Sequence, residues 1–239
     1  MNDMKNITWN KVKITVKSWR VGDYIRQTSI VVIGVVITFA GSDMISKCSE
    51  EKEIRSTMSL IRNELKRNRA NFNYIVEEFS GDERLSVLLM EHNMNYRDVP
   101  EDSLRQFGVV LGHIRSFSYT RTALDILKNS MLMQKISDKE FLLSLTEVYE
   151  TLEGFRQTMN SYYDMKDEVT TPFHLSLTDE QARLLYDGGY KTWEIYLSDR
   201  ALRNFLRIPR VYFTSDYLGS IREEIDTVIK ALEKRYDLE

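Results

Sequence analysis

The sequence predicts an all-α protein in which an N-terminal transmembrane helix continues into a helical stem and an irregular multi-helix bundle. Three observations indicate this fold class. One long uncharged apolar run lies near the N-terminus. Apolar residues elsewhere recur at spacings of three and four, as on one face of a helix. The 239 residues include only ten glycines and three prolines, which leaves few places for the turns of a sheet protein.

The composition is that of an ordinary folded chain. With 42% apolar and 29% charged residues, it excludes a disordered or collagen-like chain. The net charge of -3 argues against a general nucleic-acid-binding protein, which normally has a basic excess. The single cysteine, Cys48, cannot form an intrachain disulfide, and the histidines (His92, His113 and His174) lack partners at metal-ligand spacing. We therefore expect no metal and no cofactor.

The apolar run extends from Gln27 to Ser42, sixteen residues without a charge. It is too long for an ordinary strand, and no second strand of similar quality could pair with it. A helix of sixteen residues is about 24 Å long, so residues 25–46 are needed to cross the roughly 30 Å hydrocarbon core. Two alternatives remain open: a signal peptide cleaved near Ala40, and a buried helix of a protein core.

The charges on either side of the run predict its orientation. Residues 7–26 contain five Lys or Arg residues, and residues 44–63 contain four, diluted by acidic residues. By the positive-inside rule, residues 1–24 form a basic cytoplasmic tail, residues 25–46 span the inner (cytoplasmic) membrane, and residues 47–239 form a periplasmic helical domain. The tail mixes tryptophans with basic residues, so it either lies on anionic lipid or is a disordered segment.

Residues 47–79 are expected to form a stem helix with a heptad seam. The seam positions follow one another at alternating spacings of four and three, and Asn68 is the one polar member. They are Ile54, Met58, Ile61, Leu65, Asn68, Phe72, Ile75 and Phe79. In the span, Gly34, Thr38 and Gly41 form a small-residue face suited to close helix packing. The chain therefore either self-associates through the stem or span, or packs the stem against its own later helices.

The remaining chain is expected to form further helices. Gly81 should end the stem, and Gly108 with Gly112 should mark a close helix crossing. Capping boxes at Ser137 with Glu140 and at Thr178 with Gln181 indicate two helix starts. The predicted helices cover residues 83–95, from 102, 120–135, 138–168, 179–187, 190–206 and 216–236, with a loop at 170–177.

Several segments resemble a family of uncharacterised single-pass membrane proteins of Bacteroidota, a domain of unknown function. They are Ile33-Gly34-Val35-Val36-Ile37, Leu60-x-x-x-Glu64-Leu65-x-x-Asn68, Ser118-Tyr119-x-x-Thr122-Ala123-Leu124-x-x-Leu127-x-x-Ser130, and Ile136-x-Asp138-x-Glu140 with Tyr149. The likeness covers roughly residues 20–155 and departs at 41–46, where the family has an exit rich in Asn and Trp. The resemblance implies a membrane anchor and a helical domain, and it supplies no catalytic residue.

One cluster of charges suggests a ligand. Arg200, Arg203, Arg207 and Arg210 recur at spacings of three, four and three, so on one helix they would share a face. Guanidinium groups bind phosphate oxygens in pairs of hydrogen bonds, which suggests phosphate or lipid headgroups as ligands. Alternatively, carboxylates of neighbouring helices or water satisfy them, and Pro209 breaks the face before Arg210.

No phosphate-binding loop, nucleophile elbow, zinc-protease motif or paired-cysteine motif occurs in the sequence. We therefore expect a membrane-anchored, non-catalytic interaction protein that acts as a scaffold, accessory subunit or sensor. Its expected partners are membrane lipid and either another protein or a second copy of itself, and no nucleic acid. An anion sensor that uses the arginines is the first alternative, and an enzyme with an unrecognised helical active site is the second.

Overall fold

The structure is a computed structural model that describes the backbone of residues 4–238 and the side chains of residues 29–38 and 46–238. The regular elements of residues 4–238 are all helices, with no strand, which confirms the predicted all-α class. The chain divides into two units, residues 1–55 and residues 56–239.

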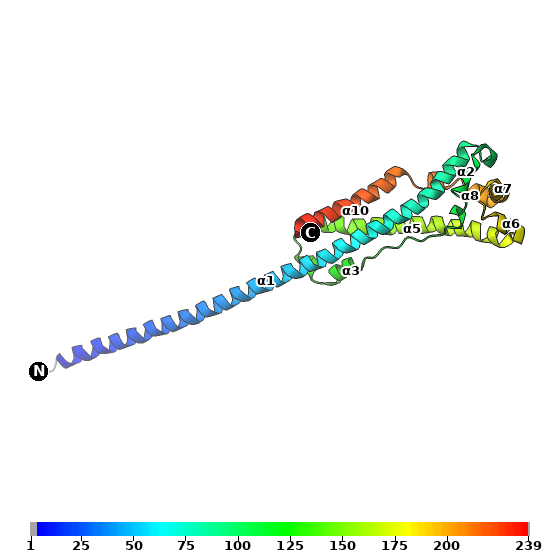
Figure 1. The fold of residues 1–239 in the computed structure, drawn as a ribbon. Coiled ribbons are helices and arrows are strands. Elements are labelled where there is room, and N and C mark those ends of the chain that lie inside the picture. The colour runs from blue at the N-terminus through cyan, green and yellow to red at the C-terminus, as the bar shows by residue number, and fades with distance from the viewer. Residues whose placement is uncertain (1–3, 239) are drawn as a thin grey trace. The chain divides into compact units, whose positions relative to one another are not determined.

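Helix α1 (Met4–Glu91) forms the described part of the first unit and supplies the first helix of the second. The other elements all belong to the second unit (Figure 1). In chain order they are η1 (Tyr96–Asp98), α2 (Glu101–Arg105), η2 (Val110–Gly112), α3 (Thr122–Asn129), α4 (Leu132–Lys135), α5 (Lys139–Ser176), α6 (Asp179–Leu184), α7 (Tyr190–Ser198), α8 (Arg200–Phe205), α9 (Pro209–Tyr212) and α10 (Ser215–Tyr236).

The second unit is built on three long helices, α1, α5 and α10, which run side by side in Figure 1. Aromatic rings fill the space between them. The ring centroids of Phe72 and Phe155 are 4.7 Å apart, and those of Phe79 and Tyr162 are 5.0 Å apart. Phe213, which precedes α10, packs edge-on against Phe79 at 5.0 Å. Edge-to-face packing of this kind adds to the stabilisation from burial alone.

The predicted stem seam is the face that α1 turns toward this core. From Met58 to Phe79 its members are at most 2% exposed, whereas Ile54 is only half-buried. The polar member, Asn68, donates to the carbonyl oxygen of Thr120 at 2.7 Å and accepts from its backbone N–H at 2.9 Å. The seam therefore packs against later parts of its own chain, and this face is not open to a second copy.

Two predicted helix breaks are wrong. Gly81 does not end α1, so the helix expected separately at 83–95 is largely the continuation of α1. The expected loop at 170–177 is the last part of α5, which contains Pro172 in its interior. A proline removes one backbone hydrogen bond from a helix. Burial of the neighbouring Phe173, whose ring lies 5.6 Å from that of Tyr196, favours the helical path.

One predicted helix start is confirmed and one is wrong. Thr178 and Gln181 form the expected capping box at the start of α6. Ser137 does not cap α5, because the carboxylate of Asp138 accepts the backbone N–H of Phe141 at 2.9 Å. The helix therefore starts one residue later than predicted.

Three predicted single helices are divided. The segment from Asp102 gives the short α2, a turn and η2, and residues 120–135 give α3 and α4. Residues 190–206 give α7 and α8, because the carboxylate of Asp199 accepts from Leu202 N at 2.8 Å and starts a new helix. Polar caps inside these segments compete with continuation of the helix.

The close approach predicted from the glycine pair occurs at Gly108. A Cβ added there would lie 3.0 Å from the Cα of Gly188, whereas one added at Gly112 would meet nothing within 4 Å. Gly188 has a φ of 69°, which favours glycine, and its carbonyl accepts from Trp193 Nε1 at 3.0 Å. The contact joins two turns, so the predicted crossing of two helices is wrong.

Candidate functional site

The first unit contains a helical segment that is apolar on every side. Seven residues between Ile30 and Ile37 are Val or Ile, and each of these side chains is between 49% and 66% exposed. A helix of a water-soluble domain is normally apolar along one stripe only. Leaving these side chains in water rather than in an apolar environment costs on the order of 10 kcal/mol. An apolar environment would therefore lower the free energy of this segment.

Two of the three small residues predicted to pack within the span, Gly34 and Thr38, lie within the described residues 29–38. A Cβ added at Gly34 would meet nothing within 4 Å. Thr38 Oγ1 donates to the carbonyl oxygen of Gly34 at 2.8 Å, so its hydroxyl is satisfied within the helix. Gly41, the third residue, lies outside the residues whose side-chain environment the structure describes. Helix packing on this face stays a prediction.

Among the residues whose side chains are described, no helix is both long enough and apolar enough to cross a membrane. The predicted span, residues 25–46, lies partly outside them, because the side chains of 25–28 and 39–45 are not described. The transmembrane helix therefore stays a prediction.

The four arginines of the predicted stripe are all exposed, but they do not lie on one helix. Arg200 and Arg203 belong to α8, Arg207 lies in the turn that follows, and Arg210 belongs to α9. Pro209 is the first residue of α9, where its missing N–H costs no helical hydrogen bond. The single helical face expected from the spacing is therefore wrong.

The guanidinium groups of these four arginines have no carboxylate within 4 Å and no hydrogen-bond partner among the described residues. From residue 199 to residue 211 the chain carries four arginines and one acid, Asp199, a net charge of +3. That carboxylate already caps α8. The backbone N–H of Arg210 donates to Ser86 Oγ at 3.4 Å, which places the start of α9 against α1. The arginines are thus exposed on a firmly attached segment and open to an anionic ligand.

A buried ion pair joins α1 to α5. The side chains of Asp82 and Lys166 are 3% and 1% exposed, and Lys166 Nζ lies 2.8 Å from both carboxylate oxygens. The same ammonium donates to the carbonyl oxygens of Val110 at 2.7 Å and His113 at 3.0 Å. Tyr162 OH donates to Asp82 Oδ2 at 2.9 Å. The pair thereby fastens the irregular segment around η2 to the bundle.

Burial acts on both members of this pair. It raises the pKa of Asp82 and lowers the pKa of Lys166, and in each case the charge of the partner opposes the shift. Burial also raises the pKa of Tyr162, with the charge of Asp82 acting in the same direction, so the hydroxyl stays protonated and donates. Groups this deeply buried cannot meet a substrate. Their role is to hold elements together.

This pair was not predicted from the sequence, although a signal for it is present. Lys166 follows Tyr162 by four residues and Asp82 follows Phe79 by three, so each continues the apolar stripe of its helix. A charged residue in phase with a buried stripe indicates a buried partner, since an unpaired buried charge is strongly unfavourable.

Residues that carry the family resemblance meet at a second polar cluster. Glu64, which is 2% exposed, accepts the backbone N–H of Ala123 at 3.0 Å and the hydroxyl of Tyr149 at 2.7 Å. Burial and the hydrogen bond to Glu64 raise the pKa of Tyr149. One turn along α1, Asn68 binds both backbone groups of Thr120. These contacts attach the start of α3 to α1, so packing accounts for the presence of these residues.

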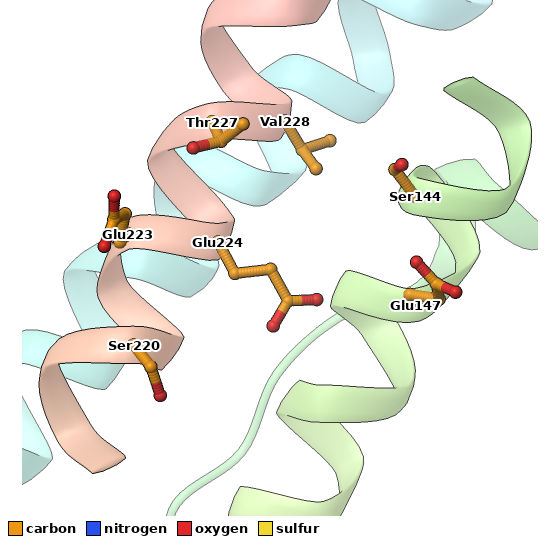
Figure 2. Close-up of a pocket in the computed structure, with 7 residues that line it drawn as sticks. All are labelled: Ser144, Glu147, Ser220, Glu223, Glu224, Thr227 and Val228. Atoms are coloured by element: carbon orange, nitrogen blue, oxygen red, sulfur yellow. The ribbon is translucent and has the colours of Figure 1, made fainter. Parts of the chain in front are cut away.

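An open groove of about 400 Å³ lies between α5 and α10 (Figure 2). Its lining residues are Ser144, Glu147, Ser220, Glu223, Glu224, Thr227 and Val228. In Figure 2 the side chain of Glu224 extends toward α5, where it accepts from Thr151 Oγ1 at 3.2 Å. The hydroxyls of Ser144 and Ser220 donate to carbonyl oxygens of their own helices, so neither is paired with a base. Within the described residues no group of three His, Cys, Asp or Glu side chains is placed to hold a metal ion.

In comparisons with known proteins, no family model matches the chain, and neither the curated proteins nor the solved structures include a match.

Proposed function

We propose that this chain is a single-pass membrane protein whose helical domain is a non-catalytic interaction module, acting as a scaffold, accessory subunit or sensor. The observation that carries the proposal is the exposure of the Val and Ile side chains from Ile30 to Ile37 on all faces of α1. Lipid covers such a segment on every side, whereas packing against one protein surface covers a single stripe.

The proposed span is residues 25–46 in the inner membrane, with residues 1–24 in the cytoplasm and residues 47–239 in the periplasm. Sixteen uncharged residues form its centre. Arg26 and Lys47 flank it and have side chains long enough to reach the headgroups. We include membership in the Bacteroidota family of uncharacterised membrane proteins in this proposal, on the strength of the motif residues alone.

An interaction role fits the described chemistry of the second unit better than catalysis. The buried ionisable groups Asp82, Lys166 and Glu64 are all engaged in contacts that join elements. The groove between α5 and α10 is wide open, and hydroxyls on both of its walls are used within their own helices. Partners in the proposal are membrane lipid and a protein, either a second copy that packs at Gly34 or a different chain.

The topology is tested by protease treatment of intact spheroplasts that express the full chain with a C-terminal tag. We expect the tag to be digested while a cytoplasmic control protein survives, because the domain lies outside the cytoplasm. Protection of the tag until the membrane is lysed would reverse the orientation. Recovery of the tagged chain in the soluble fraction would contradict the anchor itself.

A second candidate function is recognition of an anionic ligand by Arg200, Arg203, Arg207 and Arg210. This candidate is favoured because none of the four arginines has a carboxylate partner among the described residues. Arg200 and Arg203 are three residues apart on α8, so they are neighbours that repel each other until an anion binds.

This candidate is tested with Arg203→Glu plus Arg207→Glu in the full chain held in detergent micelles. Inorganic pyrophosphate is the probe, and binding is measured by calorimetry at low and high salt. We expect binding that is lost in the double variant and kept in the matched control Arg183→Glu plus Lys191→Glu, which reverses two exposed charges on α6 and α7. Equal binding by both double variants would contradict the candidate.

A further inference from the structure

The segment from Arg200 to Val211, which we call the arginine segment, carries four exposed arginines. Among the described residues, no carboxylate lies within 4 Å of any of them. This holds although acids lie on the helices that the segment packs against, Glu83 on α1 and Asp164 on α5. Val211, beside Arg210, is 74% exposed. The segment therefore combines unpaired positive charge with an exposed apolar side chain.

The groove between α5 and α10 has the opposite charge. Its lining includes Glu147 on α5 and Glu223 and Glu224 on α10, so acids border it on both helices (Figure 2). Glu147 and Glu223 are exposed and have no hydrogen bond or ion pair with any described residue. One turn beyond the lining residues lie the exposed Glu150 on α5 and Lys230 on α10, which leaves four acids against one base.

The arginines of α8 cannot reach this groove within their own chain. The rings of Phe205, the last residue of α8, and Tyr162 are 5.7 Å apart, which fixes α8 beside that part of α5. Glu147 lies fifteen residues before Tyr162, about 22 Å along the helix, and α8 is only about 9 Å long. Figure 1 likewise shows α8 and the C-terminus of α10 toward opposite ends of the second unit. Pairing of the two surfaces therefore requires two copies of the chain.

We propose that the arginine segment of one copy docks into the groove between α5 and α10 of a second copy. This inference rests on the proposed interaction role and deepens it by naming the partner. Guanidinium groups donate paired hydrogen bonds to carboxylates, so the free carboxylates of Glu147 and Glu223 fit the arginines. Leu143, one turn before Glu147 and 60% exposed, offers Val211 an apolar surface.

A second copy explains both unpaired surfaces at once. Phosphate or lipid headgroups would neutralise the arginines, but the acidic groove repels them. Because the two surfaces differ, the contact is head-to-tail, and each docked pair leaves one arginine segment and one groove free for further copies. Contacts between exposed charges are individually weak and are screened by salt, so the association should be strongest at low salt.

Crosslinking between two differently tagged full chains tests this docking. Both chains carry Cys48→Ser, which removes the exposed cysteine. One has Val211→Cys on the arginine segment and the other has Thr227→Cys in the groove, so every charged side chain of the contact remains. The chains are mixed in detergent micelles at low salt and treated with a short bismaleimide. A matched control has Leu175→Cys, which is 82% exposed near the end of α5, in place of Val211→Cys.

We expect position 211 to crosslink to position 227 of the other chain, and position 175 not to. Arg203→Glu plus Arg207→Glu in the first chain should reduce the yield about tenfold, because like charges then oppose each other. Glu147→Lys plus Glu223→Lys in the second chain should do the same. When both reversals are present, opposite charges meet again and the yield should recover. The control Arg183→Glu plus Lys191→Glu in the first chain should leave the yield unchanged.

Recovery by the combined reversals separates loss of docking from loss of folding. Equal crosslinking from positions 211 and 175, or a yield that neither reversal changes, would overturn docking between copies. A loss that the combined reversals do not restore would also overturn it. Flotation of the same proteins with lipid vesicles reports the anchor separately. Failure of docking in a protein that floats would leave the proposed anchor standing, whereas crosslinking in a protein that does not float would contradict the anchor alone.

Discussion

Helix α1 contains two apolar regions that differ in how their side chains are covered. Between residues 29 and 38 the apolar side chains point in every direction and are exposed. Between Met58 and Phe79 they form one stripe, and that stripe is buried by later parts of the same chain. The second region finds its apolar surroundings within the protein, whereas none of the described residues covers the first. The pattern around the helix, more than the amount of apolar surface, indicates the environment of each region.

The largest effect is expected from charges placed in the all-round apolar region. Ile33→Asp plus Val36→Asp should move the protein from the membrane fraction to the soluble or aggregated fraction, because each Asp at the centre of a span costs roughly 3 kcal/mol. Vesicle flotation after alkaline extraction measures this. The control Leu175→Asp changes a side chain that is 82% exposed on α5 and should leave flotation unchanged.

A substitution in the buried stripe from Met58 to Phe79, or in the side chains that cover it, should lower stability without affecting membrane attachment. Phe155→Ala removes a ring that packs against Phe72 and Phe117 and is fully buried, so it should lower the free energy of unfolding by about 3 to 5 kcal/mol. Urea titration of the full chain in micelles, followed by circular dichroism, measures the loss. Flotation should be unaffected, and Leu143→Ala at an exposed position of α5 should change the stability by less than about 0.5 kcal/mol.

Removing one member of the buried ion pair should lower the free energy of unfolding by a similar amount. Asp82→Ala leaves the ammonium of Lys166 uncompensated in the core, with an expected loss of about 3 to 5 kcal/mol. The double variant Asp82→Leu plus Lys166→Met removes both charges and should be markedly more stable than Asp82→Ala, although Val110 and His113 then lose a donor. A double variant less stable than the single one would contradict this account of the pair.

These contacts show what the sequence could and could not predict. Periodicity predicted the all-α class and the seam of α1, because each seam position needs only its own helix for the argument. It could not say whether a second copy or the same chain covers the seam. The pairing of Asn68 with Thr120, fifty-two residues away, decides that question, and no local pattern contains it.

The wrong predictions at the helix ends and at the arginines have local causes. At each position, continuing the helix and ending it differ little in free energy. At Pro172 burial of the next residue favoured the helix over the expected loop. The short α8 ends at Phe205, before Arg207, and Pro209 begins a new helix, so the four arginines do not share one helical face. The exposure of all four arginines was not predictable from spacing, since it depends on which acids the other helices bring near.

The smallest expected effect is a pH dependence at the surface of α5. Hydrogen bonds from Arg156, and also from Gln157 and Tyr119, lower the pKa of Glu153 from 4.5 to about 2. A lowered carboxylate pKa in the folded state stabilises the protein above the unfolded pKa. That contribution should be lost as the pH falls from 4.5 toward 2.

Melting temperatures between these pH values measure the effect. Glu153→Gln should show a weaker fall in melting temperature on acidification than the unchanged protein, and Glu180→Gln at an exposed position of α6 should show the same fall. Parallel curves for all three proteins would contradict the assignment of the low pKa to Glu153.

The comparison within α1 is tested most directly by the water accessibility of two engineered thiols in native membranes. With Cys48→Ser as background, Val36→Cys lies in the all-round apolar region and Leu175→Cys lies on the surface of α5. A maleimide reagent needs a thiolate in contact with water. We predict that the thiol at 175 reacts in native membrane fragments that expose both faces to the reagent, and that the thiol at 36 reacts only after denaturation. Equal reactivity of both thiols before denaturation would contradict a lipid covering for residues 29–38.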